Sequence, residues 1–153
     1  HKLDQNTVVI YASDQGFYMG EHGWFDKRFM YEESLRTPFV MRYPGQIKPG
    51  TQLQEMIVNI DFAPTILNIA GIQTPSDMQG KSFLPLVTKT TPAAKKSFAA
   101  TWRKSMYYHY YEYPQPHHVA PHFGCVRLGI SSSVFMDRTT IGNYLICKKT
   151  LPK

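Results

Sequence analysis

The sequence lacks the features that would place it in or across a membrane. No stretch approaches the roughly 18 consecutive apolar residues that a membrane-spanning helix needs, so membrane insertion is not expected. The first residues contain neither an initiator methionine nor the apolar core of a signal peptide, and we expect the sequence to begin inside a longer polypeptide. With 153 residues, an apolar fraction of 42% and a mean hydropathy of −0.33, the chain is long enough and apolar enough for one globular core.

Cysteine and a continuous basic surface are also scarce. Cys125 and Cys147 both lie in the last part of the chain, so cysteine usage says nothing about the redox compartment. The formal net charge is +6, but residues 125–153 carry five of the 17 Lys and Arg and one of the 11 Asp and Glu. No basic stripe with interleaved aromatic residues is present, and binding to nucleic acid is therefore not expected.

The first half of the sequence predicts alternating strands and helices. Residues 7–12 form a β-branched apolar run, which predicts a strand buried on both faces, and polar side chains follow at residues 13–16. Ligands usually bind at that edge of an open α/β sheet. Residues 17–29 are polar and broken by glycine, and no regular structure is expected there. A short helix is predicted at residues 31–35 and a second strand at residues 39–43.

The next segments complete the predicted α/β domain. Residues 55–59 predict a further short strand, and Asp61 is expected to cap a helix that ends before Gly71. Residues 89–96 are polar and contain a proline, which predicts a linker. A strand is expected at residues 98–102, within a second segment that begins near residue 97.

Two groups of residues are candidates for chemistry. Asp14 and Gln15 stand side by side after the first predicted strand, and their oxygen atoms suit a hard cation such as calcium, which takes several oxygen ligands. The alternative is an ordinary turn. The glycine-rich loop at residues 20–27 then places a cation, Lys27, thirteen positions after Asp14.

Residues 13–27 (SDQGFYMGEHGWFDK) closely resemble the type I, formylglycine-dependent sulfatases. The resemblance continues through residues 36–45, 59–67 and 78–86 and covers about residues 1–124. Within that family the sequence is most similar to the branch that desulfates glycans, including mucin-desulfating and N-acetylglucosamine-6-sulfatase-like enzymes.

This resemblance implies the fold and its domains. It implies part of an alkaline-phosphatase-like α/β sulfatase fold, followed by the start of a small α+β C-terminal subdomain. Residues 1–88 would be the C-terminal part of the catalytic domain, and residues 97–124 would begin the subdomain after the linker.

The resemblance also implies roles for individual side chains. Asp14 and Gln15 match the positions that bind calcium, although Asn or His is commoner at the second position. Lys27 matches the lysine that contacts the sulfate, a role that suits a cation beside a metal as the ester bond breaks. His22 is not the family's leaving-group histidine, which lies upstream. It is expected either to line the substrate pocket or to order its loop.

A segment rich in tyrosine and histidine follows at residues 107–122. Aromatic faces with polar tips suit sugar rings, and alternate tyrosines can equally pack a small sheet. The resemblance implies that His109 and His118 contact the substrate. A transition-metal site made of these histidines is the remaining alternative.

The sulfatase nucleophile is absent from this sequence. The Cys/Ser-Xaa-Pro-Xaa-Arg signature, whose first residue becomes formylglycine, occurs nowhere in the chain and is expected in an N-terminal half that precedes it. We therefore expect a sulfuric ester hydrolase acting on a sulfated glycan, inactive as this chain alone, in a periplasmic, secreted or lysosomal location. The alternatives are a phosphatase or phosphodiesterase of the same superfamily and a non-catalytic carbohydrate-binding fragment.

Residues 125–153 depart from the family pattern. One permitted coding of residues 140–151, read from its third nucleotide, gives the family-like peptide YWELFDLQKDP. We therefore interpret residues 125–153 as an out-of-frame translation, which would also explain why both cysteines and much of the charge are found there.

Overall fold

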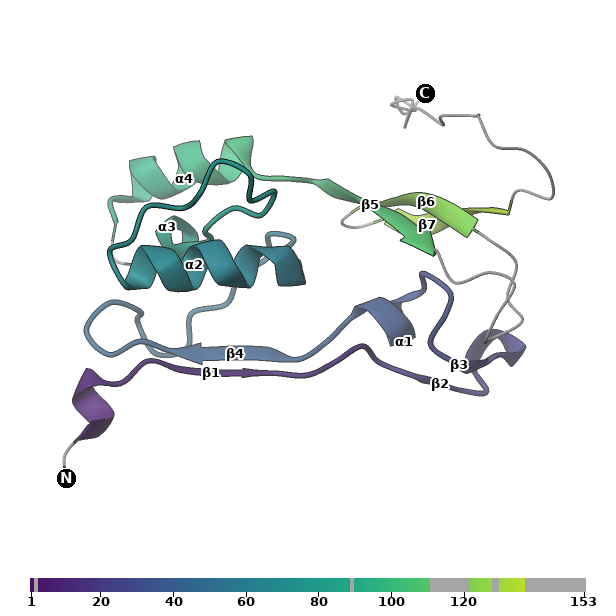
Figure 1. Ribbon diagram of the computed structural model, residues 1–153, viewed down its shortest axis with the longest axis horizontal. Helices are drawn as coiled ribbons and strands as arrows, with labels where there is room; N and C mark the ends of the chain where they lie inside the picture. The colour runs from purple at the N-terminus through teal and green to yellow at the C-terminus, as the bar shows by residue number, and fades with distance from the viewer. Residues whose placement is uncertain (2, 89, 111–121, 128–129, 137–153) are drawn as a thin grey trace. The chain divides into compact units, whose positions relative to one another are not determined.

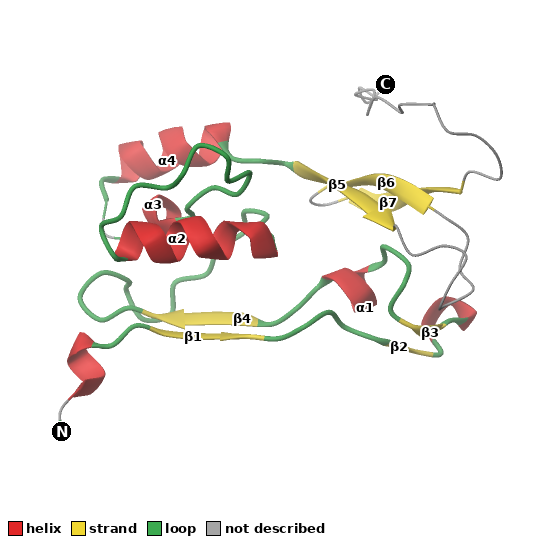
Figure 2. Cartoon of the chain, viewed as in Figure 1, coloured by secondary structure: helices red, strands yellow, loops and turns green. Residues whose placement is uncertain are grey.

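A computed structural model describes residues 1, 3–88, 90–110, 122–127 and 130–136, the last two ranges as backbone only (Figures 1 and 2). The chain divides into two compact units, each made of separate stretches of sequence. The first unit contains residues His1–Ala12 and Phe39–Lys104, and the second contains Ser13–Pro38 and Ser105–Lys153.

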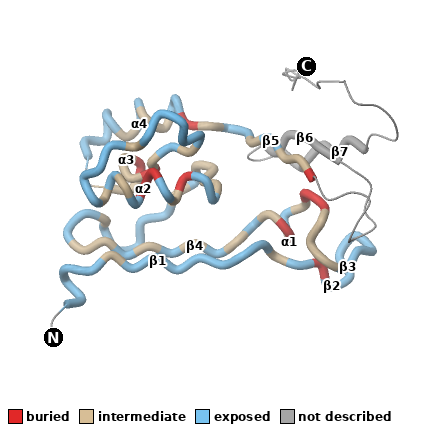
Figure 3. Tube along the Cα trace, in the orientation of Figure 1, coloured by how far each residue is buried: buried red, intermediate tan, exposed pale blue. Residues whose placement is uncertain are grey.

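The first unit contains a two-stranded antiparallel ribbon. Strand β1 (Val9–Ala12) pairs with β4 (Phe39–Arg42), which confirms the two predicted strands. All four residues of β1 are exposed, so the prediction of a strand buried on both faces is wrong (Figure 3). Among the described residues, β1 pairs with another strand on one edge only. The ribbon side chains that pack into the core, Phe39 and Met41, belong to β4.

Three helices follow the ribbon in the first unit. Helix α2 (Phe62–Ile69) begins after the 3-10 turn Asn59–Asp61 and ends before Gly71, whose φ of 71° suits a residue without a side chain. Helices α3 (Leu84–Val87) and α4 (Pro92–Thr101) come next. None of the helices in the described ranges is long and apolar enough to cross a membrane.

Helix α4 overturns the prediction of a strand at residues 98–102, since it includes nearly all of that segment. It also includes most of the segment expected to be a linker, whose role between domains stays a prediction. Thr91 caps the helix by accepting a hydrogen bond from the Ala94 N–H at 3.2 Å, and Pro92 occupies the first helical position, where proline is well tolerated. The proline therefore starts a helix here. The strand predicted at residues 55–59 is also wrong, because that segment has no strand pairing.

The core of the first unit lies between the helices and β4. Its fully buried members are Phe83, Leu86 and Trp102. The partly buried residues that pack against them are Phe39, Met41, Leu53, Ile57, Phe62, Val87, Phe98 and Ala99. The Trp102 indole donates a hydrogen bond to the Met56 carbonyl at 2.8 Å, which ties the end of α4 to the loop before α2.

Asp61 has a different role from the one predicted. Asp61 occupies the N-cap position of α2, as predicted, but its completely buried side chain makes no capping hydrogen bond to that helix. Its carboxylate accepts the N–H groups of Val58 at 3.0 Å and Lys81 at 2.8 Å. Both terminal nitrogens of the Arg103 guanidinium also donate to it. Asp61 therefore joins its own segment to two distant segments of the first unit.

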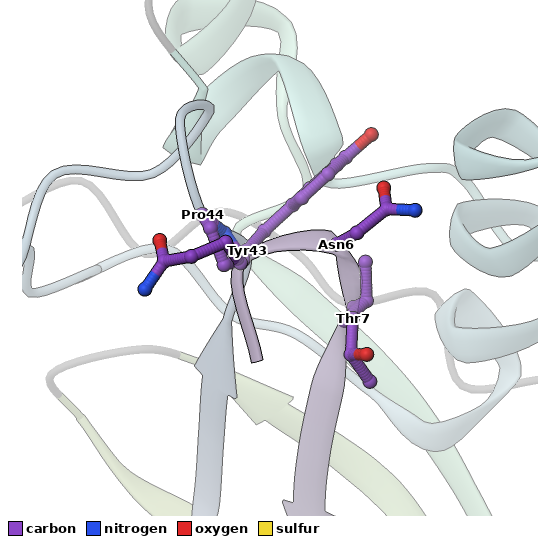
Figure 4. A pocket seen from close by; sticks show the side chains of 6 residues that line it. Asn6, Thr7, Tyr43 and Pro44 are labelled. Atoms are coloured by element: carbon purple, nitrogen blue, oxygen red, sulfur yellow. The ribbon is translucent and has the colours of Figure 1, made fainter. Parts of the chain in front are cut away.

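The first unit also has a small polar pocket (Figure 4). It measures about 190 Å³ and lies between the segment before β1 and the end of β4. Its lining residues are Gln5, Asn6, Thr7, Val8, Tyr43 and Pro44. None of the residues predicted for the active site lines this pocket.

The second unit begins with a short hairpin and a one-turn helix. Strands β2 (Tyr18–Met19) and β3 (Phe25–Asp26) pair antiparallel around the turn Glu21–Gly23, so residues 17–29 do contain regular structure, contrary to the prediction. Helix α1 (Glu32–Leu35) confirms the short helix predicted before Pro38.

A three-stranded antiparallel sheet completes the second unit. It consists of β5 (Ser105–Tyr110), β6 (His122–Arg127) and β7 (Ile130–Met136), in that order. Strand β6 crosses residue 125 and β7 lies within the segment interpreted as out of frame.

Candidate functional site

The predicted calcium ligands lie in the turn that follows β1. The Asp14 carboxylate accepts the Gln15 N–H at 2.7 Å, and the Ser13 hydroxyl donates to the Asp14 carbonyl at 2.8 Å. The Asp14 side chain is 82% exposed. The turn therefore presents an exposed carboxylate that is held by a local hydrogen bond.

Lys27 reaches the same turn from the end of the hairpin. Its ammonium nitrogen lies 2.8 Å from the Asp14 Oδ2 atom, and its backbone N–H donates to the Asp26 carboxylate at 2.8 Å. The hydrogen bond from Lys27, followed by the one from the Gln15 N–H, holds the pKa of the Asp14 carboxyl below its ordinary value. The structure thus brings the predicted metal ligand and the predicted sulfate-binding cation into direct contact, with Asp14 ionised at neutral pH.

Asp14 and Gln15 have the donor chemistry for calcium but not the number of donors. Calcium takes six to eight oxygen ligands. Within the described ranges, no three His, Cys, Asp or Glu side chains are grouped closely enough to hold a metal ion. Asp14 and Gln15 therefore fit two of the ligand positions of a calcium site, and the described residues do not supply a full set.

The turn is fixed to α1 by very close packing. The Gly16 N–H donates to the Ser34 carbonyl at 2.9 Å. A Cβ atom at Gly16 would lie 1.8 Å from the Glu33 carbonyl oxygen, so this approach excludes any larger residue.

Tyr18 anchors the segment between Lys27 and α1. Its ring is completely buried, and its hydroxyl donates to the Phe29 carbonyl at 2.6 Å and accepts the Tyr31 N–H at 3.1 Å. Burial raises the pKa of this phenol, so it remains a neutral hydrogen-bonding group.

His22 lies in the hairpin turn with a left-handed φ of 57°. Its Nε2 atom is 3.2 Å from Glu33 Oε2, and its ring stacks on Tyr31 with centroids 4.4 Å apart. These contacts hold the turn against α1 and its preceding residue, as the loop-ordering alternative requires. Contact between His22 and a substrate stays a prediction.

The tyrosines of β5 alternate between the interior and the surface. Tyr110 is buried, Tyr107 is 67% exposed, and the partly buried Tyr108 donates its hydroxyl to the Arg28 carbonyl at 2.9 Å. The Tyr107 hydroxyl lies 3.3 Å from the Nδ1 atom of His109. This alternation matches the sheet-packing alternative for Tyr108 and Tyr110 and leaves the Tyr107 ring face accessible. His118 lies outside the described residues.

Three residues that support the site were missed by the sequence analysis, namely Tyr18, Glu33 and Ser34. Tyr18 and Ser34 donate hydrogen bonds to backbone carbonyls, and Glu33 in α1 contacts the His22 ring in the hairpin turn. Glu33 and Ser34 lie in the Glu-Glu-Ser stretch of the predicted short helix, but this stretch does not have the spacing of a functional motif, so the sequence contains no usable signal for them.

The chain is similar to known sulfatases over most of its described length. The family described as N-sulphoglucosamine sulphohydrolase, C-terminal, matches residues 20–130. N-acetylglucosamine-6-O-sulfatase of Bacteroides thetaiotaomicron is 53% identical over 121 residues, which is 78% of this chain and 20% of the relative. The extracellular sulfatase SULF-1 homolog of Drosophila melanogaster is 37% identical over 94 residues, which is 61% of this chain and 8% of the relative.

A solved structure shows the same fold. It is described as a complex with its substrate, D-glucosamine-2-N,6-O-disulfate, and superposes with a TM-score of 0.70 at 51% identity. The likeness covers 81% of this chain and 24% of that protein, and it confirms the predicted alkaline-phosphatase-like sulfatase fold.

The chain thus spans about a quarter or less of the length of these relatives. The family match covers 111 of the 153 residues (20–130) and includes the Lys27 loop, α1 and the strand β5 that carries His109. The chain therefore belongs to the sulfatase family described as N-sulphoglucosamine sulphohydrolase, C-terminal.

Proposed function

We propose that this chain supplies part of the active site of a sulfuric ester hydrolase that removes sulfate from glycans. The observation that carries the proposal is the 2.8 Å contact between the Lys27 ammonium and the Asp14 carboxylate, at the end of strand β1. A cation and an ionised oxygen ligand meet there on adjacent turns, as a site for a metal and an anionic ester requires.

Lys27 is the proposed sulfate-binding residue. Its ammonium group has three N–H donors, and Asp14 engages one of them, which leaves donors that can bind sulfate oxygens. The Lys27 side chain is 27% exposed, so part of its aliphatic stem is packed, and its ammonium group is held beside Asp14. Asp14 thus orients the cation in addition to offering an oxygen to a metal.

Calcium and formylglycine are the cofactors we propose for the complete site. Bound calcium would supply positive charge beside the sulfate, and the formylglycine hydrate would supply the nucleophile, which this sequence does not contain. Asp14 and Gln15 would provide two of the calcium ligands. Without the remaining groups, the 153-residue chain alone is expected to be inactive.

The proposed substrate is a glycan that carries 6-O-sulfated glucosamine. The support is the name of the Bacteroides thetaiotaomicron relative and the ligand of the solved structure. We propose His22, His109 and His118 as substrate contacts, with the exposed Tyr107 ring beside His109 offering a face on which a sugar can stack. The extracellular relative supports a periplasmic, secreted or lysosomal location.

The proposal is tested with a chimera in which the part of this chain that aligns with the Bacteroides thetaiotaomicron relative replaces the matching segment of that relative. The chimera is expected to release sulfate from N-acetylglucosamine-6-sulfate. Asp14→Ala and Lys27→Ala should each lower kcat by about 10²–10³, the usual loss for one transition-state charge contact. The control Lys48→Ala lies outside the second unit and should leave kcat unchanged. Near-parental kcat in either site variant would remove that residue from the proposed site.

The alternatives are tested with the same proteins. Hydrolysis of a phosphate ester faster than the matching sulfate ester would favour the phosphatase or phosphodiesterase alternative. Binding of the 153-residue chain alone to a glycan array, undiminished in the Asp14→Ala variant, would favour a non-catalytic carbohydrate-binding fragment.

A further inference from the structure

Ser34 contacts both segments that carry the proposed site residues. It lies in helix α1 and is completely buried. Its hydroxyl donates a hydrogen bond to the Lys27 carbonyl at 2.8 Å, and its own carbonyl accepts the Gly16 N–H at 2.9 Å. Gly16 is two residues beyond Asp14, so one buried residue connects the Asp14 turn with the backbone of Lys27.

We propose that Ser34 is a positioning residue, which sets the distance between Asp14 and Lys27 through these two hydrogen bonds. The inference rests on the proposed function of Asp14 and Lys27, and it adds a residue that touches neither sulfate nor metal.

The Asp14–Lys27 ion pair is too weak to hold this geometry alone. The Asp14 side chain is 82% exposed, and an exposed ion pair contributes little because water and salt screen it. Lysine also has a flexible four-carbon stem. The relative position of the two charges must therefore be set by the backbone segments from which they extend.

The hydrogen bond from the Ser34 hydroxyl joins a completely buried side chain to the carbonyl of the half-buried Lys27. Removing the hydroxyl at this buried position leaves the acceptor carbonyl without its hydrogen-bond partner, which costs free energy. The close approach of Gly16 to the Glu33 carbonyl prevents the Asp14 turn from moving toward α1. On the other side, the Tyr18 hydroxyl fixes the Phe29 carbonyl and the Tyr31 N–H. Ser34 is thus attached to a rigid support.

Removal of the Ser34 hydroxyl should move Lys27 and leave the Asp14 turn in place. The substitution Ser34→Ala deletes the bond to the Lys27 carbonyl, whereas the bond from Gly16 is to the Ser34 backbone and remains. A displacement of about 1 Å in a catalytic group can lower the rate by about 10². We expect kcat to fall 10- to 100-fold with little change in KM, since the sulfate charge is bound most tightly in the transition state.

The first test measures kcat and KM in the chimera described above. Ser34→Ala is compared with Ser34→Cys, which keeps a weak donor of similar size and should recover part of kcat. The matched control is Ser82→Ala, which deletes a hydroxyl that donates to the Asn68 side chain at 2.9 Å in the first unit. Equal kcat in Ser34→Ala and Ser82→Ala, or no recovery in Ser34→Cys, would overturn the proposal.

The second test uses the 153-residue chain and separates this proposal from the proposed function. In Ser34→Ala, the Lys27 carbonyl 13C shift should change and the contacts between the Lys27 and Asp14 side chains should weaken in NMR spectra, while the Gly16 amide stays protected from exchange. This result would support the positioning role even if the chimera had no sulfatase activity. An unchanged Lys27 shift, or equal loss of protection at Gly16, would show that Ser34 has only a general structural role.

Discussion

Replacing Arg103 with methionine is expected to destabilise the first unit by about 3 kcal/mol. The Arg103 guanidinium donates to both carboxylate oxygens of Asp61, which is completely buried, and the Arg103 side chain itself is 15% exposed. The methionine keeps much of the aliphatic volume but removes the charge. The Asp61 carboxylate is then left in the interior without its cation.

The magnitude follows from the remaining partners of Asp61. Removing one member of a buried ion pair costs about 3–5 kcal/mol, because the other charge is left uncompensated. The N–H groups of Val58 and Lys81 still donate to Asp61 in the variant, which places the loss near the lower limit. For a chain of this size, a loss of about 3 kcal/mol lowers Tm by about 6–12 °C.

Urea unfolding followed by tryptophan fluorescence measures the effect, since Trp102 lies in the core beside Arg103. The matched control is Arg42→Met. Arg42 pairs with Asp4 at the surface, where a loss of at most about 1 kcal/mol is expected. The double variant Asp61→Asn with Arg103→Met should recover part of the stability, because no charge is then buried. If Arg103→Met lost no more stability than Arg42→Met, the argument from burial would be wrong.

Three further predictions concern other parts of the chain. The pKa of Asp14 lies below its ordinary value of 3.8, so the ion pair with Lys27 should stabilise the fold above pH 3.8. This stabilisation should be lost as the pH falls through the lowered pKa. An NMR titration of Asp14 with chelator present measures the pKa, and a normal or raised value would contradict the prediction. Gly80→Ala should destabilise the first unit measurably in thermal unfolding, because its Cβ would lie 1.9 Å from the Ile60 carbonyl oxygen, and an unchanged Tm would show that the backbone adapts. Val40→Lys should reduce self-association in light scattering, because Val40 is 63% exposed, and unchanged scattering would show that the chain does not associate through the ribbon.

Elements with strong local signals were predictable from the sequence. The apolar run of β4 and the Gly71 position after α2 are local features, and the structure has both elements close to their predicted limits. Helix α4 was missed because Pro92 can either interrupt a chain or begin a helix, and the Thr91 cap decides between them. Burial of β1 was mispredicted because burial depends on neighbours that a single strand does not specify.

The candidate site shows the same division. The assignment of Asp14 and Lys27 to one site followed from their positions on one loop after a strand and from the resemblance to a family, and the structure adds their direct contact. The role of Ser34 had no such signal, because it arises from a buried hydroxyl and a carbonyl that the fold places beside two other segments. Asp61 has the sequence context of a helix cap, and the distant Lys81 and Arg103 give its carboxylate other partners.

The pairing of β1 with β4 has a consequence for how the site is encoded. Ala12 and Phe39 are direct partners at the end of the ribbon, and every residue from Ser13 to Pro38 lies between them in the chain. Asp14, Lys27 and Ser34 are therefore all carried by one insertion into a hairpin that a two-residue turn could close. Such an insertion can change in length and sequence while the strand register stays the same, so Asp14, Lys27 and Ser34 can change together without any change in the pairing of β1 with β4.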